Sequence, residues 1–145
     1  MNLESRLLHL PHPSRYAVSA VAYLVSLRDE GYHMVEEIAG QTRLSASYLS
    51  KILQRLAKAG VLDSRRGAKG GYRLARPPDS VSLSEVISAS RGLETGPTPC
   101  MLEAKDCDKD HPCAMHPLVA NAEKALWNQL KENTLESFRT PKENE

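Results

Sequence analysis

The chain lacks the features of a secreted or membrane-bound protein. Its 145 residues show no sustained apolar run in the first fourteen positions, so no signal peptide is visible. The longest apolar stretch, residues 17–27, lies between Arg15 and Arg28 and is shorter than the roughly 20 residues that a membrane-spanning helix needs. We therefore expect a cytoplasmic protein with no membrane partner, in a compartment where thiols stay reduced.

The residue patterns of common enzymes are also missing. The sequence contains no Cys-x-x-Cys redox pair, no Ser/His/Asp arrangement and no pair of carboxylates at a spacing that suits acid–base catalysis. A glycine-rich stretch at residues 67–71 is not followed by the Gly-Lys-Ser/Thr of a nucleotide-binding loop. The sequence therefore predicts a protein that is not an enzyme, and turnover of a thiol or disulfide substrate would contradict this.

Acidic residues are nearly absent from one segment. Residues 43–76 contain nine Lys and Arg residues and the single acid Asp63, whereas the rest of the chain contains ten basic and seventeen acidic residues. A merely solvated surface usually mixes the two signs of charge. A block of one sign is typical of a surface that binds phosphate, which points to nucleic acid.

Hydrophobic periodicity predicts a mainly α-helical fold with a small β-hairpin. We expect helices at residues 14–27, with Ser14 as N-cap, at 34–42 and at 45–59, the last two joined by a tight turn. Two short strands at 61–64 and 72–75, joined by a basic glycine-rich loop, follow these helices. A helix-turn-helix followed by such a hairpin is a winged helix-turn-helix, and the hairpin is its wing.

The remaining segments suggest how the chain is organised. We expect an N-terminal extension at 1–13, a winged helix-turn-helix DNA-binding domain at 14–80, and a connecting helix with a cysteine-containing sensor loop at 81–117. A long dimerisation helix at 118–140, helical from 118 to 138, and a polar tail at 141–145 complete the chain. The apolar stripe of that last helix has no evident partner within the chain, which favours a homodimer.

The third helix and the wing supply the candidate DNA contacts. Hydroxyl and basic side chains on the exposed face of a recognition helix suit phosphates and guanine edges in the major groove, and a basic wing suits a neighbouring minor groove. The predicted DNA-binding residues are Ser45, Ser47, Tyr48, Lys51, Arg55, Arg65, Arg66, Lys69, Gly70, Gly71 and Tyr72. The alternative is a winged helix that binds proteins, which unaltered DNA affinity after charge reversal at Lys51, Arg55 and Lys69 would favour.

All three cysteines lie in one proline-rich segment, as Cys100-x6-Cys107-x5-Cys113-x2-His116. An odd number of cysteines in a cytoplasmic chain favours metal or redox chemistry over a disulfide framework. Thiolates and imidazole bind both iron–sulfur clusters and zinc. The absence of a Cys-x-x-Cys pair favours an iron–sulfur cluster over zinc, and reduced thiols without metal are a third alternative.

Several short segments together carry a family resemblance. They are residues 15–17 (Arg-Tyr-Ala), 37–39 (Glu-Ile-Ala), 44–49, 53–62, 66–74 with its Gly-Gly-Tyr, and 83–87 (Leu-Ser-Glu-Val-Ile). In these segments the chain resembles the Rrf2 family of bacterial winged-helix transcription regulators, which includes the iron–sulfur cluster regulator and the nitric-oxide-sensitive repressor. The resemblance runs from about residue 14 to residue 135.

The resemblance implies a homodimer that binds double-stranded DNA at a near-palindromic operator. It also implies a [2Fe–2S] or [4Fe–4S] cluster that sets DNA affinity in response to iron, nitric oxide or redox state. Its metal ligands would be Cys100, Cys107, Cys113 and His116. Some family members use an acidic fourth ligand near the first helix, but the aligned residue here is Arg15, which cannot ligate. This favours His116 and leaves His12 as an outside candidate.

Overall fold

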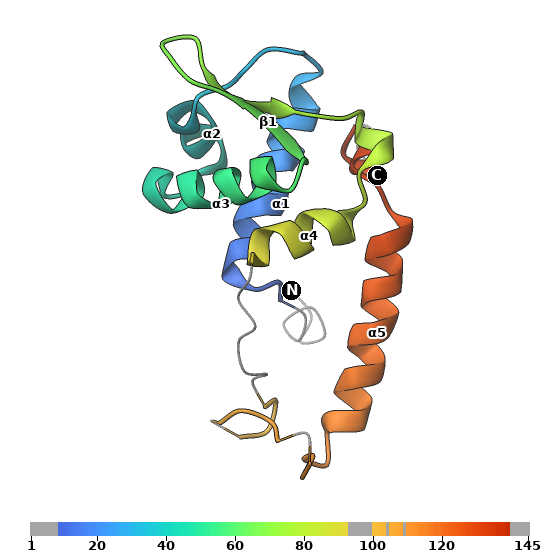
Figure 1. Ribbon diagram of the computed structural model, residues 1–145. Helices are drawn as coiled ribbons and strands as arrows, with labels where there is room; N and C mark the ends of the chain where they lie inside the picture. The colour runs from blue at the N-terminus through green and yellow to red at the C-terminus, as the bar shows by residue number, and fades with distance from the viewer. Residues whose placement is uncertain (1–8, 93–99, 104, 109, 140–145) are drawn as a thin grey trace, which may run out of the picture.

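The computed structural model describes residues 9–92, 100–103, 105–108 and 110–139 (Figure 1). Five α-helices and one two-stranded antiparallel sheet make up this part of the chain, which confirms the predicted mainly α-helical fold with a hairpin. The elements are α1 (His12–Leu27), α2 (Val35–Thr42), α3 (Ala46–Lys58), β1 (Leu62–Arg65), β2 (Gly71–Leu74), the 3-10 turn η2 (Pro78–Ser80), α4 (Leu83–Arg91), α5 (His116–Glu132) and the 3-10 turn η3 (Leu135–Phe138).

The hydrophobic core lies where α1 meets α2, α3 and α4. Helix α3 contributes a fully buried stripe at helical spacing, formed by Leu49, Ile52, Leu53 and Leu56, while its opposite face is polar. This spacing turns one face of the helix toward the core and leaves the other face to solvent. The core therefore fixes which side of α3 is available to a ligand.

Helix α1 begins two residues earlier than predicted, so the prediction of Ser14 as its N-cap is wrong. Pro11 occupies the N-cap position, and Ser14 is fully buried inside the first turn. The Ser14 Oγ lies 3.1 Å from the Ser90 Oγ, and the Ser90 hydroxyl donates to the Ile87 carbonyl at 2.6 Å. The Ser14 hydroxyl is therefore the donor in the pair, and it joins α1 to α4.

Strands β1 and β2 form the predicted wing, with Asp63 opposite Arg73. Strand β2 also pairs with the segment before α2, because the His33 and Tyr72 backbones exchange N–H···O bonds of 2.9 and 2.8 Å. The backbone passes so close there that a Cβ on Gly71 would lie 2.1 Å from the His33 carbonyl oxygen. Only glycine fits this position, which also has a φ of +131°.

The prediction of one helix from 118 to 138 is wrong at its C-terminal end. Helix α5 stops at Glu132, and the Asn133 carbonyl and Leu135 amide bond the backbone of the Val81–Leu83 segment at 2.9 Å each. Leu135 is then fully buried in the core. The apolar spacing fits a continued helix, but burying Leu135 outweighs the loss of one more helical turn.

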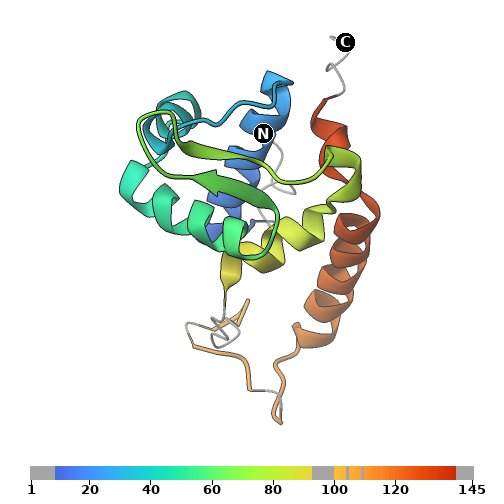
Figure 2. The ribbon, with the colours of Figure 1, turned by 45° about the horizontal axis from the view of Figure 1, so that its top comes forward.

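Helix α5 packs against α4 but keeps its apolar residues largely outside the core. Leu118 is 64% exposed and Leu126 is 39% exposed. Figures 1 and 2 show the cysteine-bearing loop on the side of α4 and α5 that faces away from the hairpin. Within the described ranges, no helix combines the length and apolar character that crossing a bilayer requires.

Candidate DNA interface and metal centre

The polar face of α3 presents the predicted DNA contacts Ser45, Ser47 and Lys51, all of which are exposed. Ser45 stands at the N-cap position, but its Oγ lies 3.2 Å from the Ser47 Oγ and does not cap the helix. Backbone amides at an uncapped helix N-terminus are available to water or phosphate oxygens. The start of α3 therefore offers both hydroxyl and amide donors on one surface.

An aromatic cluster holds the start of α3 against α1. The Tyr16 and Tyr48 rings meet edge to face with centroids 4.8 Å apart, and the His12 ring lies 5.0 and 5.3 Å from them. The Ser45 amide donates to the Tyr16 hydroxyl at 3.4 Å. His12 is thus packed beside the recognition helix, which favours a packing role over its predicted place as an outside metal ligand.

Arg55 lies on the predicted face of α3 but reaches back toward α4. Its Nη1 donates to the Ser90 carbonyl at 2.8 Å, at the C-terminal end of α4, and the residue is half-buried. Positive charge at that end of a helix is favourable. The structure therefore gives Arg55 a contact that joins α3 to α4. Its four-residue spacing from Lys51 predicted the face of the helix on which Arg55 lies, but not this contact.

The last residue of β1, Arg65, and the wing loop residues Arg66 and Lys69 are all exposed. In the described part of the chain, the side chains of Arg66 and Lys69 make no hydrogen bond or ion pair, whereas the Arg65 Nη2 donates to the Lys69 carbonyl at 2.9 Å. Gly70 is buried, and a Cβ there would lie 2.2 Å from the Arg65 carbonyl oxygen. The wing thus directs its two unpaired basic side chains into solvent, and its glycines make the loop tight.

Gly70, Gly71 and Tyr72 have structural roles that their prediction as DNA contacts did not include. The two glycines permit close backbone contacts, and Tyr72 is half-buried where β2 meets the His33 backbone. Burial also raises the pKa of the Tyr72 hydroxyl. These features favour a role in shaping the wing over direct contact with DNA.

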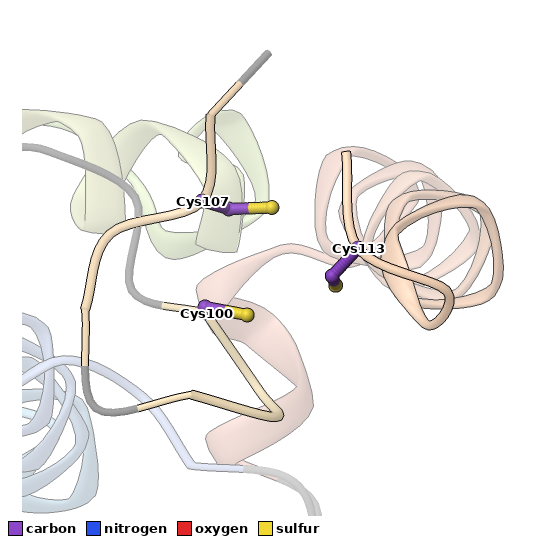
Figure 3. Close-up of side chains that lie close together, drawn as sticks. All are labelled: Cys100, Cys107 and Cys113. Atoms are coloured by element: carbon purple, nitrogen blue, oxygen red, sulfur yellow. The ribbon is translucent and has the colours of Figure 1, made fainter. Parts of the chain in front are cut away.

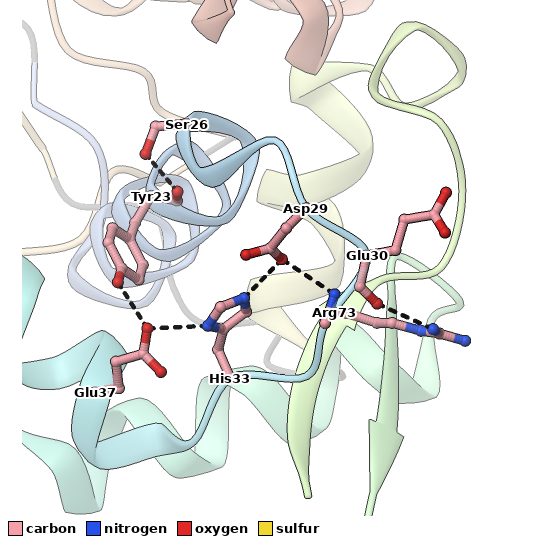
Figure 4. Close-up of polar contacts among 8 residues, drawn as sticks. Tyr23, Ser26, Asp29, Glu30, His33, Glu37 and Arg73 are labelled. Atoms are coloured by element: carbon pink, nitrogen blue, oxygen red, sulfur yellow. Dashed lines mark hydrogen bonds and ion pairs between the residues drawn. The ribbon is translucent and has the colours of Figure 1, made fainter. Parts of the chain in front are cut away.

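A polar network at the base of the wing was not predicted (Figure 4). The His33 ring lies between two carboxylates, with Nε2 2.8 Å from Asp29 Oδ1 and Nδ1 2.9 Å from Glu37 Oε1, and the Tyr23 hydroxyl donates to Glu37 at 2.8 Å. Partial burial lowers the pKa of His33, but the hydrogen bonds to Asp29 and Glu37 outweigh it and raise the pKa overall. The four-residue spacing of Asp29, His33 and Glu37 was the available sequence signal.

The three cysteines converge, as their shared segment predicted. Their Sγ atoms all lie within 4.8 Å of one another, and each residue is half-buried with a free thiol. Figure 3 shows Cys100 and Cys107 pointing toward Cys113. His116, the first residue of α5, places its Nδ1 3.1 Å from the Cys107 Sγ. The three sulfurs therefore gather near the start of α5, and the His116 ring contacts one of them.

The donor set fits a soft or borderline metal. Backbone N–H groups of Glu103 and Leu102 hold the pKa of the Cys100 thiol below its usual value, whereas desolvation raises that of Cys113. The thiolate is the form that binds metal, so the loop already favours it at one position. Three sulfurs and one imidazole nitrogen match the ligand types of iron–sulfur and zinc centres.

Recognition helix, wing and an exposed C-terminal helix together define a winged helix-turn-helix transcription regulator. The family model described as an iron-dependent transcriptional regulator, Rrf2, matches residues 10–140. The chain belongs to this Rrf2 family. It is also 31% identical over 137 residues to an HTH-type transcriptional regulator of Neisseria meningitidis serogroup A, covering 94% of this chain and 91% of the relative.

Two solved structures have the same fold. CymR, the global cysteine regulator of B. subtilis, aligns with a TM-score of 0.68 at 27% identity, covering 91% of this chain and 96% of CymR. IscR of T. potens aligns with a TM-score of 0.67 at 27% identity, covering 91% of this chain and 86% of IscR. Family membership confirms the predictions of a DNA-binding regulator and of a protein that is not an enzyme. The two structures are equally similar to this chain, so the comparison favours neither of them.

Proposed function

We propose that this chain is a dimeric transcription regulator whose affinity for a near-palindromic operator is set by an iron–sulfur cluster. The cluster would be held by Cys100, Cys107 and Cys113, and it would supply a state that responds to iron, nitric oxide or redox conditions. The observation that carries the proposal is the convergence of the three Sγ atoms within 4.8 Å, in a chain with no other cysteine. The regulator would act in the cytoplasm, where thiols remain reduced.

His116 is the best placed fourth ligand. Its Nδ1 already lies 3.1 Å from the Cys107 Sγ, and its backbone N–H donates to the Cys113 carbonyl at 3.1 Å. Replacing thiolate by imidazole raises the reduction potential of a cluster. Because His116 begins α5, ligation there would restrain the N-terminal end of that helix directly.

The homodimer is supported by the exposed apolar residues of α5. Leu118 and Leu126 lie eight residues apart in α5, which is about two helical turns, and both are exposed although they are large and apolar. A second copy of α5 would cover this face and place two α3 helices on successive turns of a duplex, about 34 Å apart. Such symmetry requires an operator of two inverted half-sites.

The two ends of α5 explain how the cysteine loop could act on DNA affinity. The N-terminal end follows the cysteines directly, whereas the C-terminal end is fixed to the winged helix by the Leu83 amide and the buried Leu135. A change in the loop would therefore tilt or release α5 relative to α3. A difference in DNA affinity of about 1–3 kcal/mol between the two states would make a useful switch.

The deciding experiment is anaerobic purification followed by iron, sulfide and zinc analysis and an absorption spectrum. DNA affinity is then measured with a duplex selected from a random-sequence library by the full-length protein. We expect wild type to contain iron and sulfide in matched amounts and to show visible charge-transfer bands. Cys107→Ser should abolish these bands. It should also abolish the difference in DNA affinity between cluster-containing and cluster-free protein. His116→Ala is compared with His111→Ala, because His111 is exposed and its ring pairs with Asp108 instead.

Zinc is the second candidate, and the compactness of the sulfur group favours it. Tetrahedral zinc with Zn–S bonds of about 2.3 Å places its sulfurs roughly 3.8 Å apart, so a group within 4.8 Å needs little contraction. One zinc per chain without iron or sulfide, after anaerobic purification, would refute the iron–sulfur cluster and support a zinc site. Protein with neither metal would refute both centres and leave a DNA-binding regulator that senses through reduced thiols.

A further inference from the structure

Tyr32, which lies just before α2, stacks with basic residues of both wing strands. The Cζ of Arg65 lies 4.3 Å from the centroid of its ring, and the Cζ of Arg73 lies 4.4 Å from it. The Tyr32 hydroxyl donates to the Asp63 Oδ2 at 2.7 Å. Cation–π contacts and a hydrogen bond thus join one aromatic side chain to β1 and β2 together.

Arg73 and Asp63 complete this attachment. The Arg73 Nε and Nη2 lie 3.3 and 3.2 Å from the Asp63 Oδ2, and the Arg73 Nη1 donates to the Glu30 carbonyl at 3.1 Å. Figure 4 shows Arg73 extending toward the Glu30 segment. The hydrogen bond from Tyr32 and the contact with Arg73 hold the pKa of Asp63 below its usual value. The single acid of the basic segment is therefore used to hold the wing, not to face DNA.

Arg65, at the end of β1, differs from the basic residues of the adjoining wing loop. Its guanidinium contacts the Tyr32 ring and donates to the Lys69 carbonyl, so it closes the loop on itself. The Arg66 and Lys69 side chains have no such contacts among the described residues. The geometry separates one arginine that shapes the loop from two basic residues that extend from it.

We propose that Tyr32 is a positioning residue for DNA binding by the wing. Its ring holds Arg65 and Arg73, and this fixes the loop from which Arg66 and Lys69 reach phosphate. A loop held in its bound shape before it meets DNA loses less conformational freedom on binding. This inference rests on the proposed DNA binding by the wing, and it assigns a role to a residue outside the basic segment.

The test compares Tyr32→Leu with Tyr32→Phe in the full-length protein. The probe is the duplex selected from a random-sequence library, and the dissociation constant is measured by fluorescence anisotropy. We expect Tyr32→Leu to weaken binding about tenfold, whereas Tyr32→Phe, which keeps the ring and loses only the bond to Asp63, stays within about threefold of wild type. Equal losses for the two variants would refute a role for the stacked ring.

A second background separates positioning from general stability. In the variant Arg66→Gln/Lys69→Gln the wing has lost its contacts, so adding Tyr32→Leu should weaken binding by less than about twofold. The same tenfold loss in this background would refute the positioning role. Arg65→Lys provides an independent check if Tyr32→Leu fails to fold, because it keeps the charge on an exposed loop but loses the planar stack. It should show the same loss and the same dependence on Arg66 and Lys69.

The two proposals fail in different ways. If Arg66→Gln/Lys69→Gln binds the selected duplex as tightly as wild type, with an unchanged salt dependence, the wing does not contact phosphate. The positioning role of Tyr32 is then refuted, and the proposed DNA interface no longer includes the wing. If that variant binds more weakly and with a shallower salt dependence, the wing contacts stand. A Tyr32 effect that does not depend on them then refutes the positioning role alone.

Discussion

Replacing Leu135 by alanine tests how the C-terminal end of the chain is held. Leu135 is fully buried, although it lies in a short 3-10 turn after α5. Burying a leucine contributes about 1.5–3 kcal/mol, and truncating it to alanine leaves a cavity that brings the usual cost to about 2–5 kcal/mol. Because η3 is short and can shift toward the cavity, we expect Leu135→Ala to lower the free energy of unfolding by about 3 kcal/mol.

Urea denaturation of metal-free protein, followed by circular dichroism at a fixed protein concentration, measures this loss. At this chain length a loss of 3 kcal/mol corresponds to a Tm lower by roughly 10 °C. The matched control is Leu102→Ala, because Leu102 is 58% exposed and its truncation should cost less than about 0.5 kcal/mol. A cost below about 1 kcal/mol for Leu135→Ala would contradict the docking of η3 and favour a helix that continues past Glu132.

Two further predictions concern the base of the wing. Because the pKa of His33 is raised, its contribution to stability is fully present below the unfolded-state pKa near 6.5 and is lost as pH rises through the higher folded-state pKa. Urea denaturation from pH 6 upward should show this loss of stability in wild type, and His33→Gln should remove it. The same dependence of stability on pH in both proteins would exclude His33 as its source. Gly71→Ala should destabilise the protein by about 2 kcal/mol or more, because its Cβ would meet the His33 carbonyl oxygen at 2.1 Å; Gly40→Ala, with no atom within 4 Å of the new Cβ, should be neutral or stabilising in the same assay.

Local patterns predicted most of the fold. The buried positions of α3 repeat at three- and four-residue steps, and the hairpin follows from two short strands around a glycine-rich loop. Ser14 and the end of α5 were predicted wrongly for one reason. A serine near a helix start usually caps the helix, and an apolar residue at helical spacing usually continues it. Here distant partners decided both positions, because Ser14 bonds Ser90 and the Leu135 amide bonds the Val81 carbonyl.

The candidate site shows the same division. The cysteine spacing predicted a common metal site, and the thiols do converge, but only the folded loop brings the His116 ring to Cys107. Arg55 was predicted as a DNA contact from its place on the helix face. Its long side chain reaches α4, and nothing in helical periodicity indicates where such a side chain ends.

Charge, periodicity and the grouping of three cysteines were therefore enough to predict a winged-helix regulator with a cysteine cluster, since each of these features depends on residues that are neighbours in the sequence. The contacts that orient its working parts were decided by the tertiary structure. Ser14 meets Ser90 and Tyr32 meets Asp63 across 76 and 31 positions of sequence, respectively. A single hydrogen bond between distant residues leaves no periodic pattern, because it depends on where the whole chain has packed and not on the residues beside it.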